Sequence, residues 1–163
     1  MTINNPSIVC AIESVKFPNV FLRLDGTKVK KFTGPGSGTA NVQYGSRDWE
    51  KFRITRQPDG TFTIESVAFP NVFLRLDGTD FDLYNKAGGG TVNGQFTARP
   101  WEYFRIMQQP DNTFTIESVH FPNVFLRLDG RNVAQFDEAG AGDANCQYGA
   151  FSWEKFRLIP DLT

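Results

Sequence analysis

The stretch Ile12-Glu-Ser-Val-Lys-Phe-Pro-Asn-Val-Phe-Leu-Arg-Leu-Asp-Gly26 occurs three times in this chain of 163 residues. It returns at 64–78 and at 116–130, and only its fifth residue changes. The tryptophans are spaced by the same 52 residues, at Trp49, Trp101 and Trp153. A period this strict has to be considered before any other feature, because it means that one structural unit is written three times. The repeats span residues 6–57, 58–109 and 110–161.

Each repeat has the pattern of short strands separated by turns. Residues 61–65 alternate between apolar and polar side chains, as a half-buried strand does. A proline-containing loop follows, and residues 73–78 then form a strand that runs into an Asp-Gly turn. Further strands are expected at 81–84 and 104–106, with a glycine-rich loop at 88–90 between them. No window shows a sustained helical period.

Four strands in each of three repeats predict an all-β fold, and a closed threefold arrangement would leave no open sheet edge. This arrangement describes a β-trefoil as one domain over residues 1–163. A three-bladed propeller is the less favoured alternative, because propellers usually carry more blades. We expect the core to consist of equivalent layers around a pseudo-threefold axis, built from Val15, Phe17, Leu22, Leu24, Phe52 and their copies in the other repeats.

Composition excludes several classes of protein. Apolar residues make up 40% of the chain, which also has 16 Phe, and this suits a globular core. The longest apolar runs are a few residues, so no membrane insertion is expected. A net charge of −1 without a large basic cluster argues against nucleic acid as a partner. The first residues lack the features of a secretory signal, so cytoplasmic residence is expected, or secretion if a leader has been removed.

The two cysteines do not follow the repeat. Cys10 stands where Phe62 and Phe114 stand, and Cys146 stands where the other repeats have Val42 and Gly94. Two half-buried free thiols are therefore expected, and a disulfide is the less favoured alternative because the sequence does not place the two residues within bridging distance.

Two segments of each repeat resemble a known family. Phe62-Thr-Ile-Glu-Ser-Val-Ala-Phe-Pro-Asn-Val-Phe-Leu-Arg75, followed in the same repeat by Trp101-Glu-Tyr-Phe-Arg-Ile106, resembles the carbohydrate-binding domain of arabinofuranosidases, carbohydrate-binding module family 42. That family's unit reads much like F-x-F-E-S-V-x-x-P-x-x-Y-I-R-H and then D-A-T-F, in a β-trefoil of similar length. The resemblance covers nearly the whole chain, and it implies a trefoil of carbohydrate-binding ancestry.

The resemblance does not extend to the family's sugar ligands. In the family, the His after the Arg and the Asp that opens D-A-T-F line each arabinose pocket. The matching positions here are apolar in every repeat: Leu24, Leu76, Leu128, Trp49, Trp101 and Trp153. The resemblance therefore implies that the inherited pocket chemistry has been lost or replaced.

A second motif, Gly-x-Gly-x-x-Asn-x-Gln followed by an aromatic residue, begins at Gly36, Gly88 and Gly140. Amides can both donate to and accept from sugar hydroxyls, and aromatic faces can cover the C–H surface of a sugar. The motif therefore predicts ligand-binding residues beside a glycine loop, and it loosely resembles the Q-x-W element of ricin-type lectins. The candidates are Asn41, Gln43, Tyr44, Asn93, Gln95, Phe96, Asn145, Gln147 and Tyr148. An equally good interpretation is that the amides tie down a loop and the aromatic ring seals the barrel.

The tryptophans Trp49, Trp101 and Trp153 complete the candidate site. A plug at the bottom of the barrel is favoured for them over a platform for stacking a ligand. Position 16 of the repeat varies as Lys16, Ala68 and His120, so sites near it would differ in affinity. Other repeated polar residues are assigned to turn hydrogen bonds and strand-end salt bridges: Glu13, Ser14, Asn19, Arg23 and Asp25.

No enzyme is expected, because His120 is the only histidine and has no copy, whereas a catalytic triad or a histidine metal site needs more. The hypothesis is a non-enzymatic lectin with up to three equivalent sites, glycans or glycoproteins as partners, and neither a cofactor nor a metal. The alternative is a protein-binding trefoil, either a protease inhibitor or a binder of actin or the cytoskeleton, because loops such as 30–35 and 82–87 diverge between repeats. An engineered scaffold or a purely structural role is less favoured than either hypothesis. The sequence does not indicate the oligomeric state.

Overall fold

The structure is a computed structural model that describes residues 6–29, 37–79, 90–131, 133 and 142–161. Within these ranges the chain forms short strands and single 3-10 turns. The first repeat contributes β1 (Ser7–Ser14), β2 (Val20–Asp25), β3 (Gly38–Tyr44), η1 (Asp48–Glu50) and β4 (Lys51–Arg56). The second contributes β5 (Phe62–Ser66), β6 (Val72–Asp77), β7 (Gly90–Phe96), η2 (Pro100–Glu102) and β8 (Phe104–Gln108). The third contributes β9 (Phe114–Ser118), β10 (Val124–Asp129), β11 (Gly142–Tyr148), η3 (Ser152–Glu154) and β12 (Phe156–Pro160).

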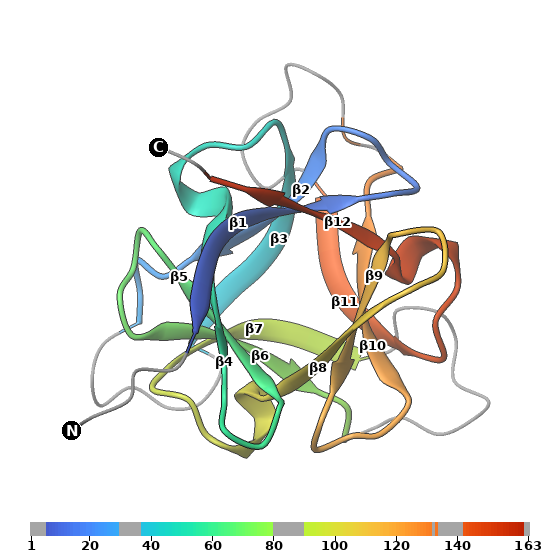
Figure 1. Ribbon diagram of the computed structural model, residues 1–163. Coiled ribbons are helices and arrows are strands. Elements are labelled where there is room, and N and C mark those ends of the chain that lie inside the picture. The colour runs from blue at the N-terminus through green and yellow to red at the C-terminus, as the bar shows by residue number, and fades with distance from the viewer. Residues whose placement is uncertain (1–5, 30–36, 80–89, 132, 134–141, 162–163) are drawn as a thin grey trace.

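Six of these strands close into a barrel. The antiparallel pairs β1–β4, β4–β5, β5–β8, β8–β9, β9–β12 and β12–β1 form a complete ring. The other six strands form the hairpins β2–β3, β6–β7 and β10–β11, which meet one another through β3, β7 and β11. Figure 1 shows the three repeats around one axis. This is the predicted β-trefoil.

The third strand of the second repeat lies outside the segment where it was expected. In the second repeat β7 covers Gly90–Phe96, where we had expected a glycine loop followed by the amide motif. The strand expected at 81–84 falls outside the described residues. Gly38 lies opposite Gly94 where β3 meets β7, and a Cβ added to Gly38 would lie 3.1 Å from the Gly94 Cα. Glycine is therefore needed here for a close approach of two strands and not for a flexible loop.

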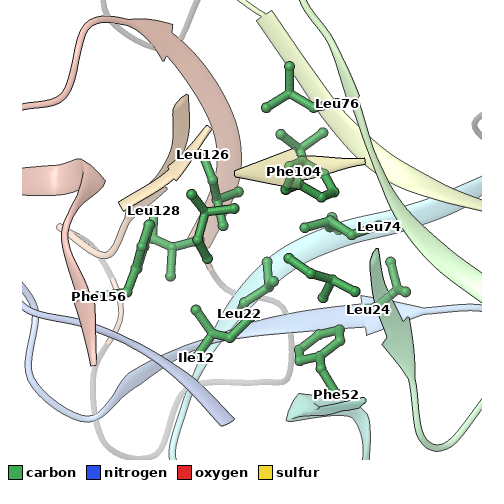
Figure 2. Packing of buried hydrophobic residues seen from close by; sticks show 14 of the residues in the cluster. Ile12, Leu22, Leu24, Phe52, Leu74, Leu76, Phe104, Leu126, Leu128 and Phe156 are labelled. Carbon is green, nitrogen blue, oxygen red and sulfur yellow. The ribbon is translucent and has the colours of Figure 1, made fainter. Parts of the chain in front are cut away.

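The core follows the threefold repeat. Each repeat contributes four of the largest fully buried side chains, which lie together where the barrel meets the hairpins (Figure 2). These are Ile12, Leu22, Leu24, Phe52, Ile64, Leu74, Leu76, Phe104, Ile116, Leu126, Leu128 and Phe156. The prediction was correct for the Leu and Phe52 sets and missed the Ile12 set.

The expectation for two core positions was wrong. Val15 is only half-buried, and its copy Val67 is 37% exposed. Phe17 and its copies are partly buried and pack against the core from outside. Both positions lie in the loop after β1, where the alternation of the strand no longer decides which side chains point inward.

The short polar residues of the repeat hold its turns, as predicted. The Glu13 Oε2 accepts the Asn19 N–H at 2.8 Å, and the Ser14 Oγ accepts the Phe17 N–H at 3.0 Å. Asn19 has φ of 69°, a conformation that asparagine tolerates better than most residues, which accounts for the repeated Phe-Pro-Asn-Val. These groups serve the scaffold.

Both cysteines are free, as expected, and they are fully buried rather than half-buried. Burial raises the pKa of the Cys10 thiol to about 11, and it raises the pKa of Cys146, together with the charge of Asp77, to about 12. Both therefore remain protonated near neutral pH. In the described part of the chain, no helix is long and apolar enough to cross a membrane.

Candidate functional site

Each tryptophan is the middle residue of a 3-10 turn that precedes the last strand of its repeat. A glutamate at the end of the turn fixes it: the Arg47 N–H donates to the Glu50 Oε1 at 2.7 Å. The equivalent bonds are 2.9 Å from Arg99 to Glu102 and 2.7 Å from Phe151 to Glu154. Each of these glutamates is 1% exposed. A buried acid therefore holds the turn that positions the tryptophan.

A glutamine donates to each glutamate, and an asparagine accepts from the arginine beside it. In the first repeat, the Gln43 Nε2 donates to the Glu50 Oε1 at 3.3 Å, and the Arg23 Nε lies 3.7 Å from the Glu50 Oε2. The Arg23 Nη1 also donates to the Asn41 Oδ1 at 3.2 Å. Alternation along β2 explains the geometry, because Leu22 and Leu24 point into the core and Arg23 points away from it.

The other two repeats copy this network with small differences. The third repeat has the same ion pair, with 3.7 Å between the Arg127 Nε and the Glu154 Oε2. In the second repeat, the Glu102 Oε2 is a buried atom with no hydrogen-bond partner among the described residues, although Gln95 still donates to the Oε1 at 2.7 Å. The Gln147 Oε1 is likewise buried without a partner there. Two buried acceptor atoms, one in the second repeat and one in the third, therefore lack a hydrogen-bond partner among the described residues.

The tryptophan rings lie between an arginine and the following repeat. The guanidinium carbon of Arg23 lies 4.4 Å from the centre of the Trp49 ring, and the copies of this contact measure 4.3 and 4.2 Å. Each ring also packs edge-to-face, with centroids 5.1 Å apart, on a phenylalanine of the neighbouring repeat. The pairs are Trp49–Phe69, Trp101–Phe121 and Trp153–Phe17. The rings are half-buried and line surface clefts, so the prediction that they plug the barrel was wrong.

These side chains form three equivalent surface hollows, which we call the clefts. Their volumes are about 250, 240 and 330 Å³ in repeats one, two and three. Arginine, glutamine, tryptophan and glutamate line all three, and the rims differ. The rim residues are Arg47 and Asp48, Arg99 and Pro100, and Phe151 and Ser152. The His120 ring lies 5.9 Å from that of Trp101, so one cleft also has an imidazole beside it.

Burial sets the electrostatics of the cleft floors. It raises the pKa of Glu50, Glu102 and Glu154, although the backbone N–H and the nearby arginine each favour the charged form. Burial also lowers the pKa of Arg127. Each cleft therefore combines a planar cation, an amide, a buried acid with a raised pKa and an indole ring.

Of the predicted site residues, the structure brings the amides and the tryptophans together. Gln43, Gln95 and Gln147 line the clefts, and Asn41, Asn93 and Asn145 each accept a hydrogen bond from the cleft arginine. Each amide has a partner within the chain, so part of its role is structural. The aromatic residues of the motif lie elsewhere, because alternation along the strand places them on the opposite face. These are Tyr44, Phe96 and Tyr148, of which Tyr148 packs against the core.

Sequence reasoning missed the arginine and the glutamate. Arg23 had been assigned to the scaffold, and Glu50 is identical in all three repeats, next to the repeated Trp49. The available signals were a charged residue repeated three times between the apolar residues of a strand, and an acid repeated three times beside a candidate tryptophan. The divergent loops at 30–35 and 82–87, and Gly36, Gly88 and Gly140, lie outside the described residues.

The two positions of each repeat that match the arabinose pocket of the resembled family lie in different environments. Leu24, Leu76 and Leu128 are fully buried in the core, so no ligand reaches them. The tryptophans at the other matching position line the clefts. Within the described ranges, no group of three or more His, Cys, Asp or Glu could hold a metal ion.

No protein-family profile matches the chain, and no curated protein matches it. Solved structures do match it. A mosquitocidal holotoxin has TM-score 0.69 and 13% identity over 98% of this chain. A lectin of Polyporus squamosus has TM-score 0.63 and 14% identity over 97% of this chain, and the protein SeviL has 0.60 and 14% over 94%.

The chain spans 18% of the holotoxin, 50% of the Polyporus squamosus lectin and 98% of SeviL. At these identities the likeness shows a shared fold. The structural matches therefore confirm the predicted β-trefoil fold. The resemblance to carbohydrate-binding module family 42 stays a prediction.

Proposed function

We propose that the protein is a non-enzymatic carbohydrate-binding protein with up to three glycan sites, one in each cleft. The observation that carries the proposal is the threefold repetition of Trp, Arg, Gln and Glu around a surface hollow. Three equivalent folded repeats require a repeated core. They do not require the polar side chains that line a surface hollow to be repeated as well. The Polyporus squamosus lectin and SeviL support the proposal, because they were solved with the epitope Neu5Aca2-6Galb1-4GlcNAc and with the asialo-GM1 saccharide.

The chemistry of the clefts suits a sugar. A guanidinium supplies several fixed donors to neighbouring hydroxyls, and an indole offers apolar surface to the C–H side of a ring. The volumes lie around or below the lower end of the roughly 300–1,000 Å³ typical of pockets for drug-sized ligands. Single sugar units at the end of a glycan are therefore the expected ligands.

Three clefts on one rigid body imply binding by avidity. Individual shallow sites bind weakly, but linked sites on one molecule can raise the combined affinity by roughly 10²–10⁴ without new contacts. Multivalent surfaces such as glycoproteins are accordingly the expected partners, and free monosaccharides should compete poorly.

The first test is a glycan array that includes arabinofuranosyl, galactosyl and sialylated ligands, followed by titration of each hit with tryptophan fluorescence. Each cleft contains a tryptophan, so binding should change the emission. We expect a stoichiometry near three. Silence on a broad array would contradict the proposal.

A single-site variant, Arg75→Met, connects the binding to a cleft. Methionine keeps an apolar chain over Trp101 and removes the guanidinium donors, and Arg75 has no ion pair with Glu102 within the described residues. The stoichiometry should fall from three to two without a change in the other sites. The control is Arg53→Met, an exposed arginine on β4 outside the clefts. Three sites remaining in Arg75→Met would place the glycan elsewhere.

A further inference from the structure

A further cavity, larger than each of the three clefts, lies at the end of the barrel opposite the hairpins. The hairpins attach where β1, β5 and β9 end, whereas this cavity is lined by residues from the starts of those strands and by residues from β4, β8 and β12. Its volume is about 450 Å³. Its walls include the threefold set Ile54, Ile106 and Leu158, with Phe62 and Phe114. We call this cavity the barrel mouth, and none of the cleft residues lines it.

The barrel mouth lies where the repeat is broken. Phe62 and Phe114 belong to one threefold position, whose third member is Cys10. Cysteine is much smaller than phenylalanine, so one of three aromatic rings is missing at this position, and Cys10 itself is fully buried and does not line the mouth. The second and third repeats begin with tight turns, closed by the bonds Gln57 N–H to Thr61 O and Gln109 N–H to Thr113 O.

The start of the first repeat differs, because Ser7 and Ile8 form part of β1 there and line the mouth. Ile8 is 51% exposed at the edge of the mouth. Apolar surface is thus left open to solvent on the side of the barrel where the symmetry fails.

The lining contains a single charged residue. Arg56 is exposed at the end of β4, and the equivalent positions in the other repeats are Gln108 and Pro160. Among the described residues, no carboxylate forms a salt bridge with Arg56. A cation at the edge of an apolar cavity is complementary to an anionic group attached to an apolar tail.

We propose that the barrel mouth binds a small amphipathic carboxylate such as a medium-chain fatty acid. The alkyl chain lies among Ile54, Ile106 and Leu158, and the carboxylate pairs with Arg56. This site is independent of the glycan sites, so one ligand should not displace the other, and either proposal can fail without the other.

The test is isothermal titration calorimetry with decanoate as the probe and decanol as its neutral analogue. We expect one decanoate per chain. Two variants take their residues from the chain's own repeats. Arg56→Gln introduces the residue of position 108 and should weaken decanoate about two- to fivefold, because it removes an ion pair at an exposed side chain, while decanol binding stays unchanged. Cys10→Phe restores the missing ring and should abolish binding of both probes.

The far-ultraviolet circular dichroism spectrum should be unchanged in both variants, which serves as the control for the fold. If Cys10→Phe fails to fold, Arg56→Gln decides the matter alone. Absence of decanoate binding to the full chain, or equal binding by Arg56→Gln and the unaltered chain, would overturn the proposal. A chain without residues 1–5 provides a further arm. If only that shortened chain binds decanoate, the head of this chain occupies the mouth and the proposal fails.

Discussion

Arg23 shows how one residue can belong to a buried strand and to a surface site. Its neighbours Leu22 and Leu24 are fully buried, whereas its own guanidinium lies over Trp49 and contacts Asn41 and Glu50. Alternation along a strand predicts that such a residue points away from the core. It does not predict the partners, because they come from the next hairpin strand and the 3-10 turn.

Thr97 is a residue in an unsuitable backbone conformation. Its φ is 71°, and the equivalent residues Gly45 and Gly149 have φ of 83° and 85°. A β-branched side chain at this φ costs roughly 1–2 kcal/mol, and glycine has no such cost. Part of this gain is offset because glycine has greater conformational freedom in the unfolded chain. We expect Thr97→Gly to raise the free energy of unfolding by about 0.5–1 kcal/mol.

Urea denaturation measures this change. The control is Thr91→Gly, because Thr91 is an exposed residue of β7 with an ordinary strand conformation, and glycine should destabilise the protein there. A loss of stability in Thr97→Gly would show that the threonine side chain makes a compensating interaction.

Among the elements, the predictable strands were those with a clear apolar alternation. Residues 61–65 and 104–106 alternate, and β5 and β8 form there. β7 escaped prediction because two of its residues, Gly90 and Gly94, have low strand propensity. That strand forms through pairing with β6 and with neighbouring hairpins, and such tertiary contacts leave little local signal.

The buried glutamate of each 3-10 turn makes the free energy of unfolding depend on pH. Burial raises the pKa of Glu102 in the folded protein above its ordinary value. The unfolded chain has a pKa of about 4.3 for this group, so between that pH and the raised folded pKa the folded protein binds more protons than the unfolded chain. The free energy of unfolding contributed by this group therefore falls as the pH rises through that window. Hydrogen bonds from Thr61 and Thr113 lower the pKa of Asp59 and Asp111, which has the opposite effect at more acidic pH.

Glu102→Gln isolates the contribution of this turn. The amide oxygen can keep the hydrogen bonds from Arg99 and Gln95, and the amide nitrogen replaces the unpartnered Oε2. We expect the variant to match the unaltered protein near pH 4 and to be more stable at pH 7, as measured by urea denaturation at both values. Glu50→Gln and Glu154→Gln should instead lower the stability at pH 7, because each also removes an ion pair with Arg23 or Arg127. A Glu102→Gln variant less stable at pH 7 would mean that the charge itself is stabilising.

At the scale of the molecule, the strict period made the trefoil predictable, because three equal units can close into a ring without an open edge. The clefts and the barrel mouth were harder to predict. Each Trp packs on a Phe of the adjacent repeat, and periodicity alone does not say which repeats become neighbours. The sequence shows that Cys10 stands where Phe62 and Phe114 stand, but only the fold shows that Phe62 and Phe114 line a cavity at one end of the barrel.

The threefold symmetry predicts similar energetics at equivalent core positions. Leu22, Leu74 and Leu126 are all fully buried at the same level of the core. Replacing each by alanine should cost about 2–5 kcal/mol, and the three costs should differ within this range because the residues opposite them are Val42, Gly94 and Cys146. Val67→Ala, at a position that is 37% exposed, should cost much less.

Urea denaturation of the four variants tests this symmetry and the cooperativity of the ring. The pairing of β1 with β12 connects the first repeat to the third, so no repeat has its full set of neighbours until all three are folded. Each variant should therefore unfold in one transition, because weakening one repeat weakens the whole ring. Separate transitions, or a cost confined to one of the three leucines, would show that the repeats are energetically distinct despite their shared geometry.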